Sequence, residues 1–398
     1  MMKKTISMRI VDWWNEENEE NFYSEQIIKI LAKRYNIVYS SKPDFLIFGP
    51  FGKNHLKYDC VRIFITGENI RTDWNIADYG IDFDFIEFGD RHLCLPLFMW
   101  CIKDLILSAI KHNRSQEFMD KKKKFCGFLA SNPNGAKHRE ELFHAICKYK
   151  KVDSGGKWLN NIGGTVGDRY KDFSSPKAQW LPQYKFNLCP ENSSHLGYTT
   201  EKIVQAYANG CVPIYWGDWS LCNKQYAKDK FIFNPKSFIN AHNFDSIEDL
   251  VDEIRRIDND DYAYFNMLKE PAFIDISLGN KSLINESKEN ITKWVRDIGE
   301  LHSKDLDLIY ENNNINHDIS KLDIYIYIYM QRTLDFFTNI FESSNPKRIQ
   351  FSQFSMSYLQ DKLITIQYEE ILRIRDKRIE RVKKFIPRPL RKFIFSFF

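Results

Sequence analysis

Apolar residues along the first two thirds of the chain gather in short runs that alternate with stretches of helical periodicity. The runs predict short buried strands at Thr5–Val11, Asp44–Gly49, Val61–Gly67, Phe125–Ala130, Tyr184–Cys189 and Cys211–Trp216. The periodic stretches predict helices at Ser24–Tyr35, Ala136–Tyr149, Thr200–Asn209 and Ser246–Ile257. Strands that alternate with helices favour parallel sheets built from βαβ units.

A Lys-rich stretch at 121–124 divides this pattern into two series. We therefore expect an α/β protein with two doubly wound, Rossmann-like domains that face a cleft, and a helical, basic C-terminal tail. The expected boundaries are 1–120, 121–345 and 346–398. Ligands of doubly wound sheets bind at the carboxyl ends of the strands. The strictly alternating run Ile324–Tyr329 predicts a half-buried strand or an edge segment.

Composition narrows the class of protein. Hydrophobic residues make up 43% of the chain and charged residues 28%, which is typical of a soluble protein with real cores. The eight cysteines are scattered without a CxxC pair, so we expect reduced thiols and no metal site. The N-terminus lacks the pattern of a signal peptide, and no apolar run reaches the roughly 18 residues of a membrane span, so we expect a cytoplasmic location.

Charge is distributed unevenly. The segment from Arg373 to Lys392 contains ten basic and two acidic residues, a net charge of +8. Because the whole chain has a net charge of +4, the rest of it carries −4. A mildly acidic body argues against nucleic-acid binding. Basic residues beside the aromatic end of the tail suit the surface of an anionic membrane. The alternative is a tail that folds back on the body or mediates oligomers.

The block Tyr184–Gly217 reads as a strand, a polar loop, a helix start and a second strand. Glu201 and Lys202 fall in the first turn of that helix, where free backbone N–H groups and the helix dipole favour an anion. A departing nucleoside diphosphate needs such positive charge. Glu201 is placed to accept hydrogen bonds from a ribose. Taken alone, a Glu-Lys pair at a helix start is more often a solvated cap.

The exact residues of this block are more specific than its pattern of strands and helix. It contains Phe186-Asn187-Leu188-Cys189, Glu191-Asn192, Gly197-Tyr198, Thr200-Glu201-Lys202-Ile203 and Val212-Pro213-Ile214-Tyr215-Trp216-Gly217. Further elements are Trp13-Trp14, Thr66-Gly67-Glu68-Asn69, Leu95-Pro96-Leu97, Ala130-Ser131-Asn132-Pro133-Asn134 and Asn234-Pro235-Lys236-Ser237-Phe238. Over about residues 8–300 the chain resembles the α1,3/4-fucosyltransferases of glycosyltransferase family 10, especially the bacterial Helicobacter-type enzymes.

The resemblance implies a GT-B fold and an inverting reaction with GDP-β-L-fucose. It assigns the general base to Glu68, at the end of a predicted strand in the acceptor-binding domain. It assigns the diphosphate to Arg139 and Lys202, and places Asn192, Tyr198 and Glu201 around the phosphates and the ribose. Without the resemblance, Glu68 would bind backbone amides in a turn, and Arg139 would form a surface salt bridge with a neighbouring glutamate.

The resemblance also implies the biological setting. The acceptor would be a glycan with Galβ1,4GlcNAc, as in Lewis-antigen-like lipopolysaccharide, and the enzyme would sit peripherally on the inner membrane. No cofactor is required, no metal ion is held by the protein, and a divalent cation would at most stimulate by screening phosphate charge. Type 1 chains, which require α1,4 transfer, stay open as acceptors.

Two other functions remain open. One is a different GT-B glycosyltransferase that uses another nucleotide sugar, and the other is an inactive nucleotide- or glycan-binding protein on the same scaffold. The chain also departs from the family pattern. Pro190 replaces an aromatic residue, the segment 218–230 is longer than expected, and the heptad repeats of some Helicobacter relatives are missing.

Overall fold

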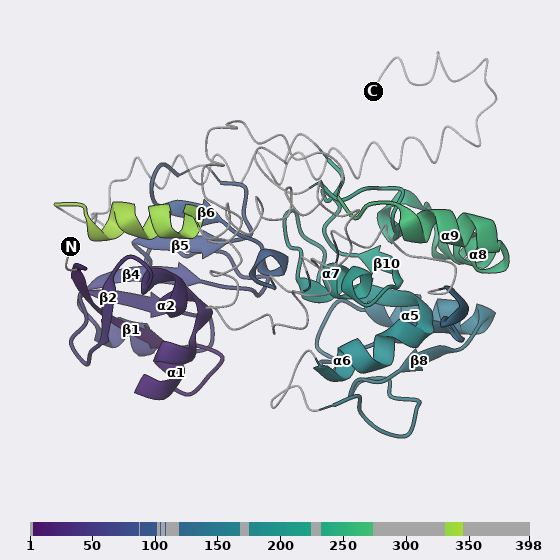
Figure 1. Ribbon diagram of the computed structural model, residues 1–398, viewed down its shortest axis with the longest axis horizontal. Coiled ribbons are helices and arrows are strands. Elements are labelled where there is room, and N and C mark those ends of the chain that lie inside the picture. Colours follow the sequence, from purple (N-terminus) through teal and green to yellow (C-terminus); the bar gives the residue numbers. More distant parts are fainter. Residues whose placement is uncertain are drawn as a thin grey trace, which may run out of the picture. The chain divides into compact units, whose positions relative to one another are not determined.

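A computed structural model describes residues 3–86, 88–101, 104, 108, 119–167, 175–223, 232–273 and 331–344. Within this part the chain forms two parallel sheets with helices packed against them, which confirms the expected α/β class (Figure 1). Both sheets belong to one compact unit of the chain. None of the helices described combines the length and apolar character that crossing a membrane requires.

The first sheet has six parallel strands in the order β2-β1-β3-β4-β5-β6. The strands are β1 (Thr5–Val11), β2 (Asn36–Tyr39), β3 (Phe45–Phe48), β4 (Val61–Ile65), β5 (Tyr79–Asp82) and β6 (His92–Cys94). Its helical segments are α1 (Glu19–Ser24), α2 (Gln26–Leu31), and the 3₁₀ turns Asn54–Lys57 and Leu97–Trp100. The central strands are buried and rich in Ile and Phe, as parallel strands covered on both faces must be.

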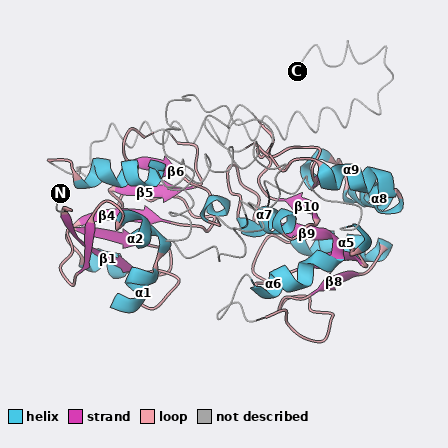
Figure 2. Ribbon diagram, viewed as in Figure 1, coloured by secondary structure: helices cyan, strands magenta, loops and turns pink. Residues whose placement is uncertain are grey.

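The second sheet has five parallel strands in the order β11-β10-β9-β7-β8. They are β7 (Lys124–Phe128), β8 (Val152–Ser154), β9 (Tyr184–Pro190), β10 (Val212–Trp216) and β11 (Ile239–Asn240). The helices are α5 (His138–Tyr149), α6 (Ser175–Trp180), α7 (Glu201–Ala208), α8 (Ile247–Asn259) and α9 (Asp261–Lys269), with 3₁₀ turns at Leu181–Gln183 and Ala241–Asn243 (Figure 2).

Local chemistry accounts for several element boundaries. Helix α8 begins after Ser246, whose hydroxyl accepts a hydrogen bond from the Asp249 amide at 3.0 Å. Helix α7 is followed by Gly210 with a φ of +75°, a left-handed conformation that costs glycine little. The helix predicted over 24–35 is shorter than expected, because Glu25 is extended between α1 and α2. Lys124, predicted as linker, is the first residue of β7.

Residues 331–341 form a helix that returns to the first sheet. In Figure 1 this yellow-green helix lies beside β5, where Phe336 contacts Tyr79. Phe341 packs against Tyr35 and Phe45, with ring centroids 5.3 and 4.7 Å apart, and Lys4 Nζ donates to the Phe341 carbonyl at 2.6 Å. A boundary at residue 345 would assign this helix to the second domain, whereas its contacts are with the first sheet. The run Ile324–Tyr329, the segment 224–231 and the tail lie outside the described residues.

Candidate functional site

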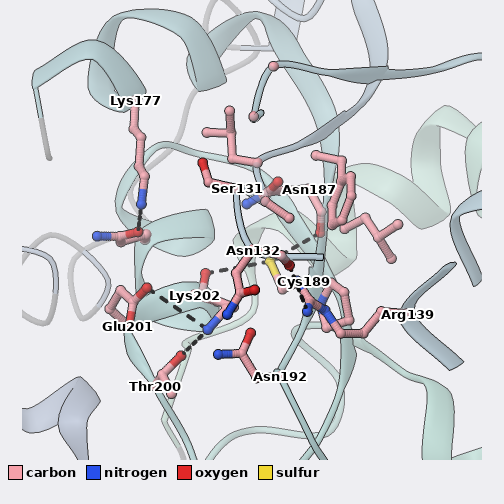
Figure 3. Close-up of a pocket in the computed structure, with 18 of the residues that line it drawn as sticks. Ser131, Asn132, Arg139, Lys177, Asn187, Cys189, Asn192, Thr200, Glu201 and Lys202 are labelled. Atoms are coloured by element: carbon pink, nitrogen blue, oxygen red, sulfur yellow. Dashed lines mark hydrogen bonds and ion pairs between the residues drawn. The ribbon is translucent and has the colours of Figure 1, made fainter. Parts of the chain in front are cut away.

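The second sheet has a topological switch point between β7 and β9, where the strand order reverses, because β8 lies on one side of β7 and β9 on the other. A pocket of about 410 Å³ opens at the carboxyl ends of these strands, where doubly wound sheets bind ligands. All six residues that the sequence proposed for the site line this pocket: Glu68, Arg139, Asn192, Tyr198, Glu201 and Lys202. Figure 3 shows four of them, with Arg139 and Lys202 both directed into the pocket.

Lys202 is held at the start of α7 by a buried carboxylate that the sequence had not singled out. Its Nζ lies 2.9 Å from Glu191 Oε2 and donates to Thr200 Oγ1 at 2.7 Å. Glu191 is fully buried and also accepts hydrogen bonds from the Thr200 amide at 2.7 Å and the Thr200 hydroxyl at 2.6 Å. The carboxylate of Glu191 therefore fixes the ammonium group of Lys202 within the pocket wall.

Burial and the neighbouring charges shift the pKa values of these groups in different directions. Burial raises the pKa of Glu191. Burial also lowers the pKa of Lys202, but the charges of Glu191 and Glu201 outweigh it, so the Lys202 pKa is raised. For Glu201, burial is outweighed by Lys202 and Lys177, and its pKa is lowered. At neutral pH the start of α7 thus carries a fixed ammonium beside an ionised carboxylate.

Arg139 is the second residue of α5, and it is only 2% exposed. Its guanidinium lies 4.9 Å from the centre of the Trp158 ring and donates from Nη1 to the Asn132 carbonyl at 3.3 Å. A Cβ at Gly135 would overlap this guanidinium, so a larger residue there would displace it from its present position. Burial lowers the pKa of Arg139. The structure thus contradicts a surface salt bridge as the role of Arg139.

Two buried polar atoms of the pocket wall find no hydrogen-bond partner among the described residues. One is Arg139 Nε, a donor, and the other is Asn187 Oδ1, an acceptor on β9 whose residue is 6% exposed. Leaving such an atom unpaired typically costs about 1–3 kcal/mol. Both residues line the same pocket, although the two unpaired atoms are themselves shielded from solvent.

Glu68 follows β4 and is half-buried in the pocket wall, and its amide donates to Thr66 Oγ1 at 2.9 Å. The loop that carries it is tied to the loop after β9. Asn69 Nδ2 donates to Ser193 Oγ at 2.5 Å, and Arg71 Nη2 lies 2.6 Å from His195 Nε2. These contacts bring a carboxylate of the first sheet to the pocket of the second.

Several pocket residues were missing from the sequence prediction, among them Asn187, Gln205 and Lys177. Asn187 and Gln205 stand within the block Tyr184–Gly217, but nothing in the pattern marked them as pocket-facing. Lys177 comes from α6, and its Nζ donates to Gln205 Oε1 at 2.9 Å, with burial lowering its pKa. Figure 3 shows Lys177 entering the pocket from a different element than Lys202. No sequence signal separates Lys177 from the other lysines.

The remaining features fit this description. All eight cysteines are free thiols, as expected. Pro190 is the last residue of β9, paired with Trp216 of β10, and lines the pocket. Among the described residues, no group of three His, Cys, Asp or Glu side chains is arranged to hold a metal ion. The expectation about metals stays a prediction.

Comparison with known proteins gives consistent matches. Residues 8–101 match the alpha-(1,3)-fucosyltransferase FucT N-terminal domain, and residues 119–288 match glycosyltransferase family 10 (fucosyltransferase), C-terminal. Alpha-(1,3)-fucosyltransferase FucT of Helicobacter pylori is 34% identical over 303 residues, 67% of this chain and 60% of that protein. An alpha-(1,4)-fucosyltransferase of Arabidopsis thaliana is 30% identical over 139 residues, 32% of this chain and 33% of that protein.

Solved structures agree. The crystal structure of an alpha1,3-fucosyltransferase with GDP-fucose is 28% identical and superposes with a TM-score of 0.56, over 76% of this chain and 92% of that one. A crystal structure of alpha1,3-fucosyltransferase with GDP gives the same values. The expected GT-B-like fold is therefore confirmed. The chain spans about 60% of the length of the Helicobacter pylori relative.

Proposed function

This chain belongs to glycosyltransferase family 10, and we propose that it is an inverting α1,3-fucosyltransferase that uses GDP-β-L-fucose. The proposed acceptor is the GlcNAc of a Galβ1,4GlcNAc-type glycan. One observation carries the proposal. A carboxylate, Glu68, lines the same pocket as Arg139 and the cationic start of α7, so a base and an anion-binding wall meet in one site.

Positive charge in the pocket supports binding of the donor. Arg139 and Lys202 would hold the diphosphate, since a guanidinium matches phosphate oxygens and the helix start favours an anion. By family resemblance, Asn192, Tyr198 and Glu201 surround the phosphates and ribose. The lowered pKa of Glu201 keeps it ionised and able to accept hydrogen bonds from ribose hydroxyls.

The reaction then follows as a single displacement. The acceptor hydroxyl gives its proton to the Glu68 carboxylate while its oxygen forms a bond to the anomeric carbon of fucose. The bond from that carbon to the β-phosphate oxygen breaks, and GDP leaves on the opposite face with the bonding electrons. Lys202 and Arg139 stabilise the charge that grows on the leaving oxygen. The configuration at the anomeric carbon is inverted from β to α.

We extend the proposal to the setting. The product would be a Lewis-antigen-like lipopolysaccharide, made on the cytoplasmic surface of the inner membrane with the basic tail as the contact. Neither a resident metal ion nor a cofactor is part of the proposal, and a divalent cation would act only by screening phosphate charge.

A donor panel tests the proposal. The full chain is incubated with Galβ1,4GlcNAc and, separately, GDP-fucose, GDP-mannose, UDP-galactose or UDP-GlcNAc, and release of the nucleoside diphosphate is measured with and without the disaccharide. We expect acceptor-dependent release of GDP from GDP-fucose alone. Faster turnover of another donor would indicate a different glycosyltransferase, and binding of GDP without any turnover would indicate an inactive scaffold.

A further inference from the structure

Two exposed aromatic side chains stand at the point where the first sheet changes direction. The strand order reverses between β1 and β3, because β2 lies on one side of β1 and β3 on the other, so this is the topological switch point of the sheet. Trp14 follows β1 and Phe51 follows β3. Trp14 is 46% exposed and Phe51 is 51% exposed, and their ring centroids are 5.3 Å apart at an interplanar angle of 67°. The corresponding point of the second sheet is the donor pocket, and ligands of such sheets bind at these points.

The aromatic pair is held rigidly from below. Trp14 contacts Trp13 edge to face, with centroids 4.5 Å apart, and Trp13 packs against the hydrophobic core. The Phe51 amide donates to the carbonyl of Asp12 at 3.3 Å, which joins the two loops. Asp12 itself has a φ of +54°, a left-handed conformation that a non-glycine residue adopts only where its surroundings impose it.

A buried histidine–aspartate contact supplies that constraint. The Asp12 carboxylate lies 2.7 Å from His55 Nδ1 and accepts hydrogen bonds from the amides of Asn54 at 2.9 Å and His55 at 3.0 Å. A Cβ at Gly49 would overlap the Asp12 carbonyl oxygen, so the β3 loop packs directly on this backbone. Aromatic rings that are exposed and yet fixed in place are typical of a recognition surface.

The position of Trp14 identifies the class of ligand. Trp14 lines the same pocket as Gly67 and Glu68, and the acceptor hydroxyl must reach Glu68. A pyranose ring carries C–H groups on one face and hydroxyls around its edge. An exposed indole covers such an apolar face and leaves the hydroxyls to water, because its own body is apolar and its N–H is polar.

We propose that Trp14, supported by Phe51, is the acceptor subsite and stacks on a pyranose ring of the glycan while the reacting hydroxyl faces Glu68. This inference rests on the proposed transferase function. It gives the first sheet a specific role, in which Trp14 binds the acceptor but takes no part in binding GDP.

Steady-state kinetics of Trp14→Ala and Trp14→Phe test the subsite. The concentration of Galβ1,4GlcNAc is varied at saturating GDP-fucose, and then the reverse. Losing one stacked ring should raise the acceptor KM about tenfold in Trp14→Ala and less in Trp14→Phe. The KM of GDP-fucose and the Kd of GDP should stay within about twofold. Tyr262→Ala is the matched control, because Tyr262 is 77% exposed on α9 and lines no part of the pocket.

Saturation-transfer NMR with the disaccharide and GDP together detects direct contact with the sugar. This signal would not change if Trp14 had only a structural role. In the parent protein the C–H protons of one pyranose face should receive the strongest saturation, and Trp14→Ala should abolish this while the GDP signals persist. An unchanged acceptor KM in Trp14→Ala, or a change of oligomeric state instead of a change in acceptor KM, overturns the proposal. Should Trp14→Ala lose GDP binding through misfolding, Trp14→Phe decides by its acceptor KM in the same way.

The two levels of inference fail separately. A parent protein that transfers no fucose to any glycan would refute the proposed function itself. A parent protein that transfers fucose, with variants of unchanged acceptor KM, would refute only the aromatic subsite.

Discussion

At the scale of single residues, Glu68 has the sharpest assignment. Replacing it with Gln removes the proton acceptor and keeps the shape, so turnover should fall by roughly 10²–10⁴-fold, the usual effect of losing a general base. Binding of GDP-fucose should hardly change, because the residues proposed to hold the diphosphate lie elsewhere in the pocket. Single-turnover kinetics and calorimetry measure the two quantities. Turnover within a few-fold of the parent would remove Glu68 from this role, and exposed Glu140→Gln serves as the control.

Arg139 and Lys202, the donor clamp proposed to hold the diphosphate, give a separate prediction. Arg139→Ala and Lys202→Ala should each weaken GDP binding by about 1.5–3 kcal/mol, roughly 10- to 150-fold, because charged hydrogen bonds to a buried phosphate are lost. Titration calorimetry with GDP measures this. Lys148→Ala is the matched control, since Lys148 is exposed on the same helix as Arg139. Parent-like affinity in both clamp variants would contradict the assignment.

The sequence brought the six proposed residues together, but it did not predict their environment. All six residues line one pocket, and they could be proposed because they stand in recognisable motifs. Glu191 belongs to the same motif, yet its pairing with Lys202 depends on complete burial, which the local pattern does not reveal. Asn187 and Lys177 face the pocket for reasons of strand register and helix packing. Burial, strand register and helix packing depend on tertiary structure and cannot be seen in the local pattern of one sequence.

At the scale of elements, Asp82 joins β5 to its neighbours. It accepts hydrogen bonds from Thr72 Oγ1 at 2.6 Å and the Asp84 amide at 2.8 Å, and it lies 2.8 Å from His92 Nε2. Burial raises the pKa of Asp82, but His92 and these hydrogen bonds outweigh it and lower the pKa to about 2 from 3.8. The folded-state pKa therefore lies below the unfolded value.

This shift predicts how stability depends on pH. Asp82 contributes stability that is fully present above pH 3.8 and is lost as the pH falls toward 2, with a magnitude of about 2 kcal/mol. Between pH 6 and 3, the free energy of unfolding measured in urea should fall more steeply for the parent than for Asp82→Asn. Asp252→Asn, on the exposed face of α8, should follow the parent. Equal pH slopes for parent and Asp82→Asn would contradict the shift.

The shortest strands of the second sheet were not predictable from the sequence. The strands at Thr5–Val11 and Tyr184–Pro190 are seven residues long, which is enough for their apolar pattern to be seen. Strands β8 and β11 have only three and two residues, too few for any periodicity. The break at Glu25 escaped prediction because both sides of it are compatible with a helix.

At the scale of the whole molecule, the return of helix 331–341 to the first sheet was not predicted. Its Phe336, Phe337 and Phe341 look like any apolar run in the sequence, and only the contacts with Tyr79, Tyr35 and Phe45 reveal the partner. Packing over some 300 residues of sequence separation is a tertiary choice that local pattern does not record.

The basic tail carries the last mutational prediction. It lies outside the described residues, and the prediction rests on its charge of +8 beside terminal aromatic residues. Each Lys or Arg near an anionic bilayer contributes about 1 kcal/mol. Deleting 373–398 should release the protein from anionic liposomes and leave transfer to a soluble disaccharide intact, because no proposed site residue lies there. Equal flotation of full-length and truncated protein would show that the tail is not the anchor.

The linkage of the product tests the central claim most directly. The full chain is incubated with GDP-fucose and an equimolar mixture of Galβ1,4GlcNAc and Galβ1,3GlcNAc, and the product is characterised by NMR. The proposed function predicts one new α-linked fucose at O3 of GlcNAc in the Galβ1,4GlcNAc disaccharide. Fucose attached to O4 of GlcNAc, fucose attached to galactose, or a β-linked product would each contradict it, as would the absence of any fucosylated disaccharide.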